Sequence, residues 1–292
     1  MKWVQLNGGN YMLKSLYSGV TGMKSQQTKM DVISNNIANV STTGFKSGRV
    51  RFEDMISQTN ANAQAGINAQ QVGLGVQNSS IDTIMTGGSL QTTGRALDFG
   101  IENGDSSFFT VSANDGTGNS YTRDGGFYTG YNGDLVTSSG LNVMGYGVQD
   151  GEIVEGTLVA LNIPASAIGE GGATVDLQNY TVDKTGLITG TYSDGNVYTI
   201  GQIALTSFSN PDGLEKAGSN LYTATANSGN PVLGEPGEPG FGNVQSGFLE
   251  MSNVDLANEF TEMIVTNRAY QANSRSITTS DQMLEELINL KR

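Results

Sequence analysis

The apolar positions near the start of the chain recur with helical spacing. From residue 16 onward they fall three or four residues apart, with Gln27 in one slot of the series. The pattern predicts an amphipathic helix over residues 12–45 that stops near Gly44, because glycine commonly follows a helix C-terminus. We expect its packing face to hold Leu16, Val20, Met23, Met30, Ile33 and Ile37.

A second helical series occupies residues 253–292, with steps that alternate between four and three residues. Ser252 or Asn253 is the expected cap, with Asp255 in the first turn. The large apolar members of the series are Leu256, Phe260, Met263, Tyr270, Ile277, Leu284 and Ile288. Its polar members Asn267, Ser274 and Asp281 are expected to set the register between neighbouring helices, as buried polar residues do in coiled coils.

Both helices are expected to be marginal in isolation. Gly19 and Gly22 each lower helix stability by about 1 kcal/mol relative to alanine, and such helices order mainly when they pack. Two arrangements fit the periodicity. The helices form either a coiled-coil hairpin that caps a globular domain or a pair that packs against copies of itself in a polymer.

Between the helices the pattern changes to short β-type runs divided by glycine, aspartate and asparagine turns. Asn132-Gly133 and Asp194-Gly195 are typical hairpin turns. We therefore predict a mainly β chain with terminal α-helices, whose all-β outer domain over residues 81–240 is a sandwich or an irregular barrel. Residues 46–80 are expected to form an extended connector, with a polar tract at 57–71 that is extended, disordered or a plain surface loop. Residues 241–252 are expected to form the return connector.

The amino-acid composition excludes several classes of catalytic and metal site. The 292 residues include 40 glycines but no histidine and no cysteine, which excludes catalysis by those residues, the usual zinc sites and disulfides. The formal net charge of −13 argues against nucleic-acid binding. The excess of acidic over basic residues lies in residues 52–249, which hold 20 acidic and 4 basic residues. That distribution fits either a self-repelling outer surface or ordinary solubility.

The chain has no recognisable catalytic or ligand motif. The stretch Asp115–Asn119 lacks the acidic residues of a calcium loop and predicts a hairpin turn instead. The glycine-rich stretches lack a Walker lysine and a strand–helix nucleotide motif. Arg95 and Arg123 are interpreted as structural ion-pair partners. We expect no enzyme activity, metal, cofactor or small-molecule substrate.

The first eleven residues, MKWVQLNGGNY, do not share the helical pattern. One interpretation is a start codon placed too early, with Met12 as the true initiator; the other is a genuine flexible tail. The sequence shows no secretory signal peptide and no apolar run of 18 residues that could span a membrane.

Two long motifs resemble those of the bacterial flagellar axial proteins, which form the rod and hook. They are MDVISNNIANVSTTGFK at residues 30–46 and LEMSNVDLANEFTEMI at residues 249–264. Asn35, Asn36, Asn39, Gly44, Phe45, Asn253 and Asp255 are the signature positions. Residues 72–76, 88–94 and 280–292 are most similar to hook proteins.

The resemblance implies a helical homopolymer whose terminal helices line a tube beneath a β shell. It favours the hook, a bendable joint that transmits torque; the alternatives are the distal rod and, remotely, a secreted adhesin with a coiled-coil stalk. It further implies export by the flagellar type III apparatus without a cleaved signal peptide. The expected partners are other copies, the distal rod, the hook cap and the hook–filament junction proteins. Deleting residues 250–292 is expected to abolish polymerisation and leave the β domain folded.

Overall fold

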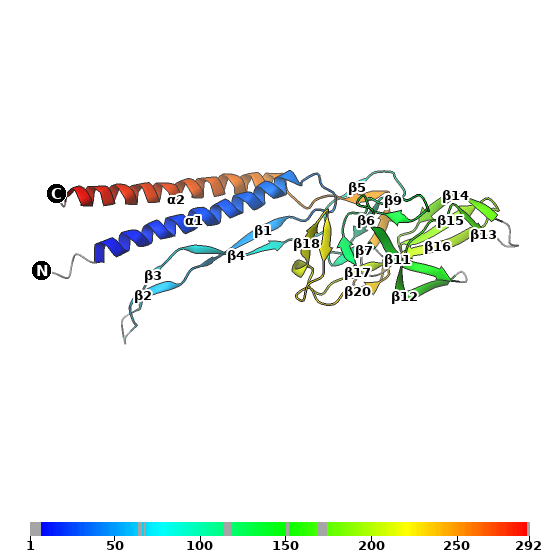
Figure 1. The fold of residues 1–292 in the computed structure, drawn as a ribbon, viewed down its shortest axis with the longest axis horizontal. Helices are drawn as coiled ribbons and strands as arrows, with labels where there is room; N and C mark the ends of the chain where they lie inside the picture. Colours follow the sequence, from blue (N-terminus) through cyan, green and yellow to red (C-terminus); the bar gives the residue numbers. More distant parts are fainter. Residues whose placement is uncertain are drawn as a thin grey trace. The chain divides into compact units, whose positions relative to one another are not determined.

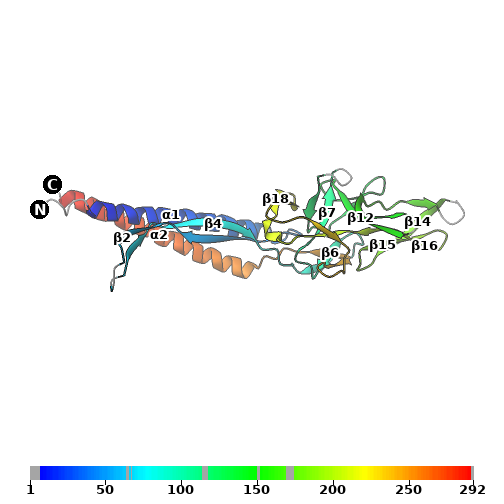
Figure 2. The ribbon, with the colours of Figure 1, turned by 90° about the horizontal axis from the view of Figure 1, so that it is seen from below.

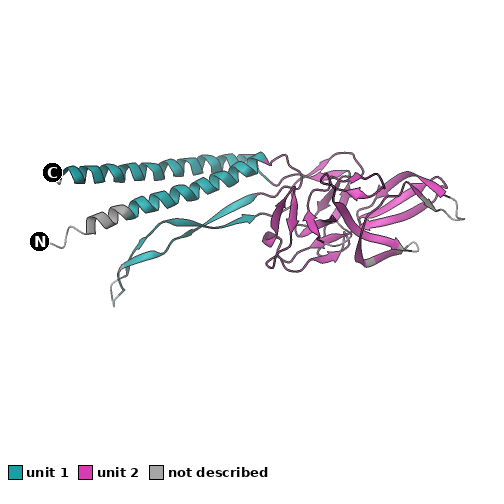
Figure 3. Ribbon diagram, viewed as in Figure 1, with its two compact units in different colours: residues 1–38, 48–83, 254–292 teal, residues 39–47, 84–253 magenta. Residues whose placement is uncertain are grey.

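The computed structural model of the chain describes residues 7–63, 66, 68–113, 118–149, 152–168 and 174–290. In sequence order, helix α1 (Asn7–Ala38) precedes a long series of β-strands and helix α2 (Leu256–Leu290) follows it. The two helices lie side by side (Figure 1). The predicted fold class, mainly β with terminal helices, is confirmed. The chain divides into two compact units (Figure 3). Unit 1 comprises residues 1–38, 48–83 and 254–292, and unit 2 comprises residues 39–47 and 84–253.

Unit 1 combines α1 and α2 with four strands. These are β1 (Gly48–Asp54), β2 (Ser57–Ala61), β3 (Gln70–Gly73) and β4 (Val76–Thr83). The two helices run side by side, and α1 also contacts β1 and β4 (Figure 2). Helix α1 therefore has two packing faces, one toward α2 and one toward the strands.

Both helices differ from the predicted bounds. Helix α1 begins at Asn7 rather than at residue 12, and it ends at Ala38 rather than at residue 45. It ends early because residues 39–44 form turns, in which the Thr42 backbone N–H donates to the Asn39 carbonyl and Gly44 has a positive φ of 66°. Residues 1–6, in the N-terminal extension, lie outside the described residues.

Helix α2 begins after Asp255, which is the true cap. The Asp255 Oδ1 accepts hydrogen bonds from the backbone N–H groups of Ala257 at 2.9 Å and Asn258 at 3.4 Å. A capping aspartate also places negative charge at the positive end of the helix dipole. The expected caps Ser252 and Asn253 precede it, and the Asn253 side chain bonds elsewhere, as described below.

Residues 48–83 form a paired β-ribbon rather than the expected extended connector. Strand β1 pairs with β4, and β2 pairs with β3, both antiparallel. Between the two ladders the Met55 backbone N–H donates to the Gly75 carbonyl. The outer ladder, β2 with β3, is exposed at almost every described position, so its sequence lacks the alternation of a half-buried strand.

Unit 2 is built around a large antiparallel sheet. Its main path runs β13-β14-β15-β16-β11-β7-β8-β19-β18, with β9, β10, β12, β17 and β20 attached to it. These strands are β7 (Ser107–Ser112), β8 (Ser120–Thr122), β9 (Tyr128–Thr129), β10 (Leu135–Val136), β11 (Asn142–Gln149), β12 (Glu152–Ala160), β13 (Ser166–Ile168), β14 (Thr174–Val182), β15 (Leu187–Tyr192), β16 (Val197–Ile203), β17 (Leu205–Ser207), β18 (Glu215–Gly218), β19 (Leu221–Thr223) and β20 (Val232–Gly234). A 3₁₀ turn, η1 (Pro211–Gly213), precedes β18.

The expected return connector is also paired structure. Strand β21 (Asn243–Ser246) pairs with β6 (Phe99–Glu102), and β22 (Phe248–Glu250) pairs with β5 (Leu90–Thr92). Residues 243–250 are therefore an integral part of unit 2, because their backbone groups bond to strands near its start.

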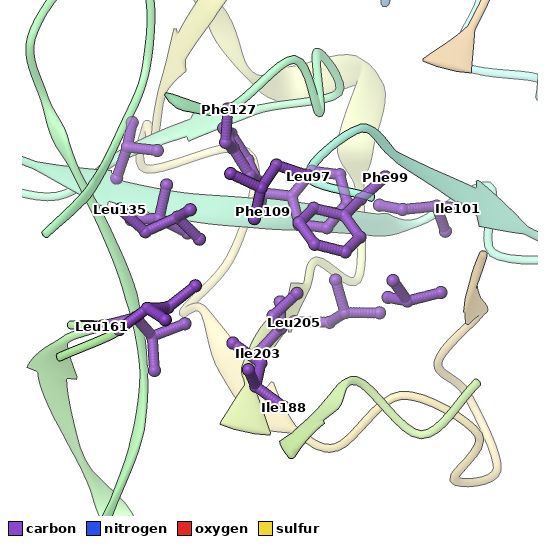
Figure 4. Close-up of a cluster of buried hydrophobic side chains, with 14 residues drawn as sticks. Leu97, Phe99, Ile101, Phe109, Phe127, Leu135, Leu161, Ile188, Ile203 and Leu205 are labelled. Atoms are coloured by element: carbon purple, nitrogen blue, oxygen red, sulfur yellow. The ribbon is translucent and has the colours of Figure 1, made fainter. Parts of the chain in front are cut away.

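The core of unit 2 lies between these strands (Figure 4). Its buried members include Phe99, Phe109, Phe127, Leu135, Leu161, Ile188, Ile203 and Leu205. Each fully buried side chain of this size stabilises the fold by about 1.5–3 kcal/mol relative to an exposed one. A second cluster contains Met85, Phe108, Tyr121, Phe208, Leu214 and Tyr222. This core gives unit 2 a source of stability independent of the helices.

The two predicted hairpin turns are confirmed. Gly133 lies between β9 and β10 with a φ of 89°, and Gly195 lies between β15 and β16 with a φ of 83°. Both angles fall in the left-handed region that glycine adopts without strain. Most of the turn predicted at residues 115–119 lies outside the described residues.

Candidate assembly surface and the signature residues

The seam between α1 and α2 is lined by small residues on α1. A Cβ atom built on Gly19 would lie 2.8 Å from Cγ1 of Ile277, and one built on Gly22 would lie 2.7 Å from Nδ2 of Asn273. The glycines that weaken the helix on its own therefore permit close approach of the partner helix. Close packing of the two helices therefore explains the two glycines inside α1. From the sequence alone they were interpreted only as residues that lower helix stability.

Three polar pairs fix the antiparallel register of the seam. Ser15 Oγ lies 3.2 Å from Ser280 Oγ, Lys29 Nζ lies 2.5 Å from Glu262 Oε2, and the Asn36 Nδ2 group donates to Glu259 Oε1 at 2.9 Å. The pairs are spread along both helices and occur in opposite order on the two, as antiparallel packing requires. Burial raises the pKa of Glu259, an effect that the Asn36 hydrogen bond partly offsets.

Asn36 also attaches α1 to the ribbon. Its side chain is 2% exposed, its Oδ1 accepts from the Gly48 backbone N–H, and its Nδ2 donates to the Gly48 carbonyl, both at 2.9 Å. One amide thereby serves three groups on two other segments of unit 1, β1 and α2. Replacing it leaves the half-buried backbone groups of Gly48 without these partners, which is costly.

The predicted packing residues divide into three classes. Ile33 is buried, and Leu16, Met23, Met30, Ile37, Met263, Ile277 and Leu284 are half-buried. Val20, Leu256, Phe260, Tyr270 and Ile288 are exposed in the single chain, up to 68% for Ile288. Exposed apolar residues that the pattern missed are Tyr17, Ile264, Val265, Met283 and Leu290. The described helices thus present a large apolar surface that their own chain leaves uncovered, which is a mark of an interaction face.

The polar residues predicted to set register lie away from the seam contacts described above. Asn267 and Asp281 are exposed and Ser274 is half-buried. Asn267 accepts a hydrogen bond from Gln271 of the same helix at 2.8 Å. Register within the chain is set by the three pairs named above, and a role for Asn267, Ser274 and Asp281 between copies stays a prediction.

The two sequence motifs meet in unit 2 at a buried charge cluster, which consists of Lys46 from the first motif, Glu250 from the second, and Arg123. Lys46 Nζ lies 2.5 Å from Glu250 Oε1, and Arg123 lies 3.3 Å from Glu250 Oε2. All three side chains are at most 1% exposed. Burial lowers the pKa of both Lys46 and Arg123, and the Glu250 carboxylate opposes that shift.

The charge cluster lies where the chain enters and leaves unit 2. Next to it the Gly44 backbone N–H donates to the Glu250 carbonyl at 2.8 Å, and a Cβ on Gly44 would lie 2.6 Å from the Asp124 nitrogen. Asn253 Oδ1 accepts from the Ser47 backbone N–H, and its Nδ2 donates to the Ile84 carbonyl. The signature residues Gly44 and Asn253 therefore help to join, by hydrogen bonds, two segments that are about 200 residues apart in sequence.

The remaining signature positions have simpler roles. Lys216 lies over the Phe45 ring, with its Nζ 5.0 Å from the ring centroid. Asn39 Oδ1 accepts from the Thr42 hydroxyl within a turn. Asn35 is exposed on α1, and Asp255 caps α2. The predicted roles of Arg95 and Arg123 as ion-pair partners are confirmed, with Asp98 and Glu250 respectively.

Three family models match separate parts of the chain: the N-terminal segment, the C-terminal segment and part of the β-rich middle. Residues 16–46 match the flagella basal body rod protein family, and residues 245–290 match the flagellar basal body rod FlgEFG protein C-terminal family. Residues 103–190 match the flagellar hook protein FlgE/F/G D1 domain. The matched terminal segments contain the signature residues and most of both helices.

Curated relatives extend the match to nearly the whole chain. The flagellar basal-body rod protein FlgG of Bacillus subtilis (strain 168) is 46% identical over 288 residues, covering 96% of this chain and all of the relative. FlgG of Buchnera aphidicola subsp. Schizaphis graminum is 40% identical with the same coverage. The flagellar hook protein FlgE of Borreliella burgdorferi is 32% identical, again covering 96% of this chain and all of the relative.

The chain belongs to the flagellar rod and hook family of axial proteins. Its relatives are components of the flagellar basal body and hook. Among the described residues no helix combines the length and apolar character needed to cross a bilayer.

Proposed function

We propose that this chain is a structural subunit of the distal flagellar rod, the rigid drive shaft of the basal body, rather than of the hook. The observation that carries the proposal is the length of the match to rod proteins: 288 aligned positions cover all of the Bacillus subtilis rod protein and 96% of this chain. The alignment to the Borreliella hook protein runs over 445 positions, although this chain has 292 residues. The hook relative therefore carries a long segment that this chain lacks.

The β-ribbon supports the same choice. A connector that was only extended would behave as a flexible tether. Residues 48–83 instead form two antiparallel ladders, and α1 packs against β1 and β4. A Cβ on Gly75 would collide with the side chain of Thr21, so ribbon and helix are in close contact. Cross-strand hydrogen bonds restrain such a segment against bending, which suits a shaft better than a joint.

Polymerisation is supported by the uncovered apolar side chains of the helices. Phe260 is 50% exposed and Ile264 is 63% exposed on α2. Burying such residues against neighbouring copies supplies the hydrophobic free energy for assembly. The helices then form the inner layer of the polymer and unit 2 its outer layer. Copies of the same chain and the adjoining axial subunits, including the hook, are the partners in this proposal.

The proposed role is mechanical rather than catalytic. The chain is exported through the flagellar type III apparatus without a cleaved signal peptide, and its helices order on assembly. The second candidate is the hook itself, which is favoured by the full-length match to hook proteins at 32% identity. The two candidates differ in the stage at which assembly stops when the subunit is absent.

A deletion strain examined by electron microscopy of isolated basal bodies tests the choice. The rod proposal predicts basal bodies whose rod is incomplete. Basal bodies with a complete rod that lack only the hook would reject the rod and favour the hook. A copy of the gene restored in the same strain controls for effects on neighbouring genes.

A matched test in vitro uses a shortened chain. Glu250 and Asn253 are part of unit 2, so the deletion of residues 250–292 that the sequence suggested would remove both ion pairs of the charge cluster. Deleting residues 254–292 keeps both residues. Sedimentation should then show folded monomers of the shortened chain under conditions in which the full chain forms tubes.

A further inference from the structure

The outward face of α2 carries an unusual order of charges. Asn273, Ile277 and Ser280 face α1. Arg275 lies two residues from Asn273 and two from Ile277, which places it on the opposite side of a helix with 3.6 residues per turn. Arg268, seven residues before Arg275, and Glu286, eleven residues after it, lie on the same outward face. This face is therefore basic in the middle and acidic at its C-terminal end.

The two arginines have no acidic partner in the described part of the chain. Ion pairs within 4.0 Å there involve other residues, and the Arg268 guanidinium only donates to Gln271 Oε1 at 3.4 Å. Arg268 and Arg275 line one shallow groove together with Gln271, Ala272, Thr279 and Met283. The groove presents two exposed cations about 10 Å apart along the helix axis.

The acidic end is unfavourable within its own helix. Glu285 and Glu286 lie in the last two turns of α2, are exposed, and form no ion pair in the described residues. Negative charge at a helix C-terminus opposes the helix dipole and lowers the stability of the helix. Cations from another molecule would relieve that cost. Lys291 and Arg292, which follow in the sequence, lie outside the described residues, and the test below separates their effect.

We propose that the outward face of α2 docks on α2 of a second copy, with Glu286 of one copy paired with Arg275 or Arg268 of the next. This inference rests on the proposed function and adds the contact that sets the stagger between subunits. At 1.5 Å per residue, Glu286 lies about 16 Å from Arg275 and about 27 Å from Arg268 along the helix. Parallel neighbours would therefore be displaced by one of these two distances.

Charge reversal tests the pairing. Glu286→Arg should raise the concentration needed for polymerisation about tenfold at low salt, and so should Arg275→Glu or Arg268→Glu, whichever arginine is the partner, because each places like charges at the contact. Combining Glu286→Arg with the reversal of its partner arginine should restore assembly. Glu238→Arg, an exposed change in unit 2, makes the same change in net charge as Glu286→Arg and should have no effect. If Lys291 and Arg292 serve the acidic end instead, neither Arg275→Glu nor Arg268→Glu will rescue Glu286→Arg, and the proposal fails.

The absence of cysteine allows a direct test of contact. Chains carrying Arg275→Cys are mixed with chains carrying Glu286→Cys, polymerised and oxidised; a parallel mixture pairs Arg268→Cys with Glu286→Cys. Cross-linked heterodimers are expected in one of the mixtures, because a disulfide requires Cα atoms within about 7 Å. Tubes of the unaltered chain without any heterodimer would overturn this inference alone. Failure of the unaltered chain to form tubes would instead count against the proposed function.

Discussion

Gly22 on α1 faces Asn273 on α2 so closely that a Cβ at position 22 would lie 2.7 Å from the Asn273 Nδ2 atom. One turn away, Gly19 has the same relationship to Ile277. The helix pair therefore depends on the absence of side chains at two positions of α1. This relationship leads to a test of how tightly the two helices pack.

Replacing Gly19 or Gly22 by valine should weaken the helix pair. The added side chain overpacks the seam, which costs about 1–3 kcal/mol, although valine has a somewhat higher helix propensity than glycine. The thermal midpoint for dissociation of the polymer, followed by far-UV circular dichroism, should fall. Gly73→Ala is the control, because a Cβ at Gly73 has no neighbour within 4 Å. An unchanged midpoint for both valine variants would mean that the seam is looser than described.

Replacing Glu250 by glutamine should destabilise unit 2 by about 3–5 kcal/mol, because Lys46 and Arg123 remain as buried cations without their counter-ion. Urea unfolding followed by near-UV circular dichroism measures the change. Glu238→Gln removes an exposed carboxylate and should leave the transition in place. A shift below about 1 kcal/mol for Glu250→Gln would show that the cluster relaxes or admits water.

The free energy of unfolding should fall between about pH 10 and pH 12. Burial raises the pKa of Tyr222 from 10.0 to about 12, so the folded chain binds more protons than the unfolded chain in that window. Full ionisation removes stability on the order of 3 kcal/mol. Burial also raises the pKa of Tyr121 and Tyr192, which adds to the decline.

Lys46 has the opposite effect on the pH dependence of stability. Because its pKa is lowered in the folded chain, the free energy of unfolding rises with pH until the unfolded lysine titrates near 10.5. Above that pH the tyrosines decide the slope. Tyr222→Phe should flatten the decline in stability measured by urea unfolding at several pH values. Tyr131→Phe, at a fully exposed position, should leave the slope unchanged. Equal slopes in all three chains would contradict the assignment.

Replacing Asp255 by alanine should destabilise the start of α2 by about 0.5–2 kcal/mol, because the Ala257 and Asn258 backbone N–H groups lose their acceptor. Asp255→Ser keeps a capping oxygen and should recover most of the loss. Hydrogen exchange of the first turn of α2 in the polymer gives the measurement. Equal protection in the alanine and serine variants would reject the cap.

The helices and the β character of the middle were predictable because they depend on local periodicity. Ile33 and Ile277 recur at helical spacing and do pack, and Asn132-Gly133 marks its hairpin through backbone chemistry. The small-residue seam was missed because a search for apolar stripes scores large side chains and treats Gly19 and Gly22 as defects. The outer ribbon was missed because residues such as Thr59 and Gln71 are exposed on both faces and show no alternation.

The charge cluster depends on long-range contacts that no local pattern reveals. Lys46 and Glu250 are separated by 204 positions, and each alone has the appearance of a surface residue. Both lie inside the quoted motifs, so a search for opposite charges shared by the two motifs could have paired them. The preference for the hook followed short motifs at residues 72–94 and 280–292, whereas the length of the match to rod proteins supports the proposed rod.

The hydrogen bonds between residues 44–47 and 250–253 have a consequence for how this family diversifies. The segment that first enters unit 2 and the segment that finally leaves it are joined by backbone and side-chain hydrogen bonds at one place. Residues 84–249 are therefore an insertion whose ends are already joined, because Asn253 also donates to the Ile84 carbonyl. Such an insertion can be enlarged or exchanged during evolution while the helices keep their sequence, which explains how much longer relatives retain full-length similarity to this chain.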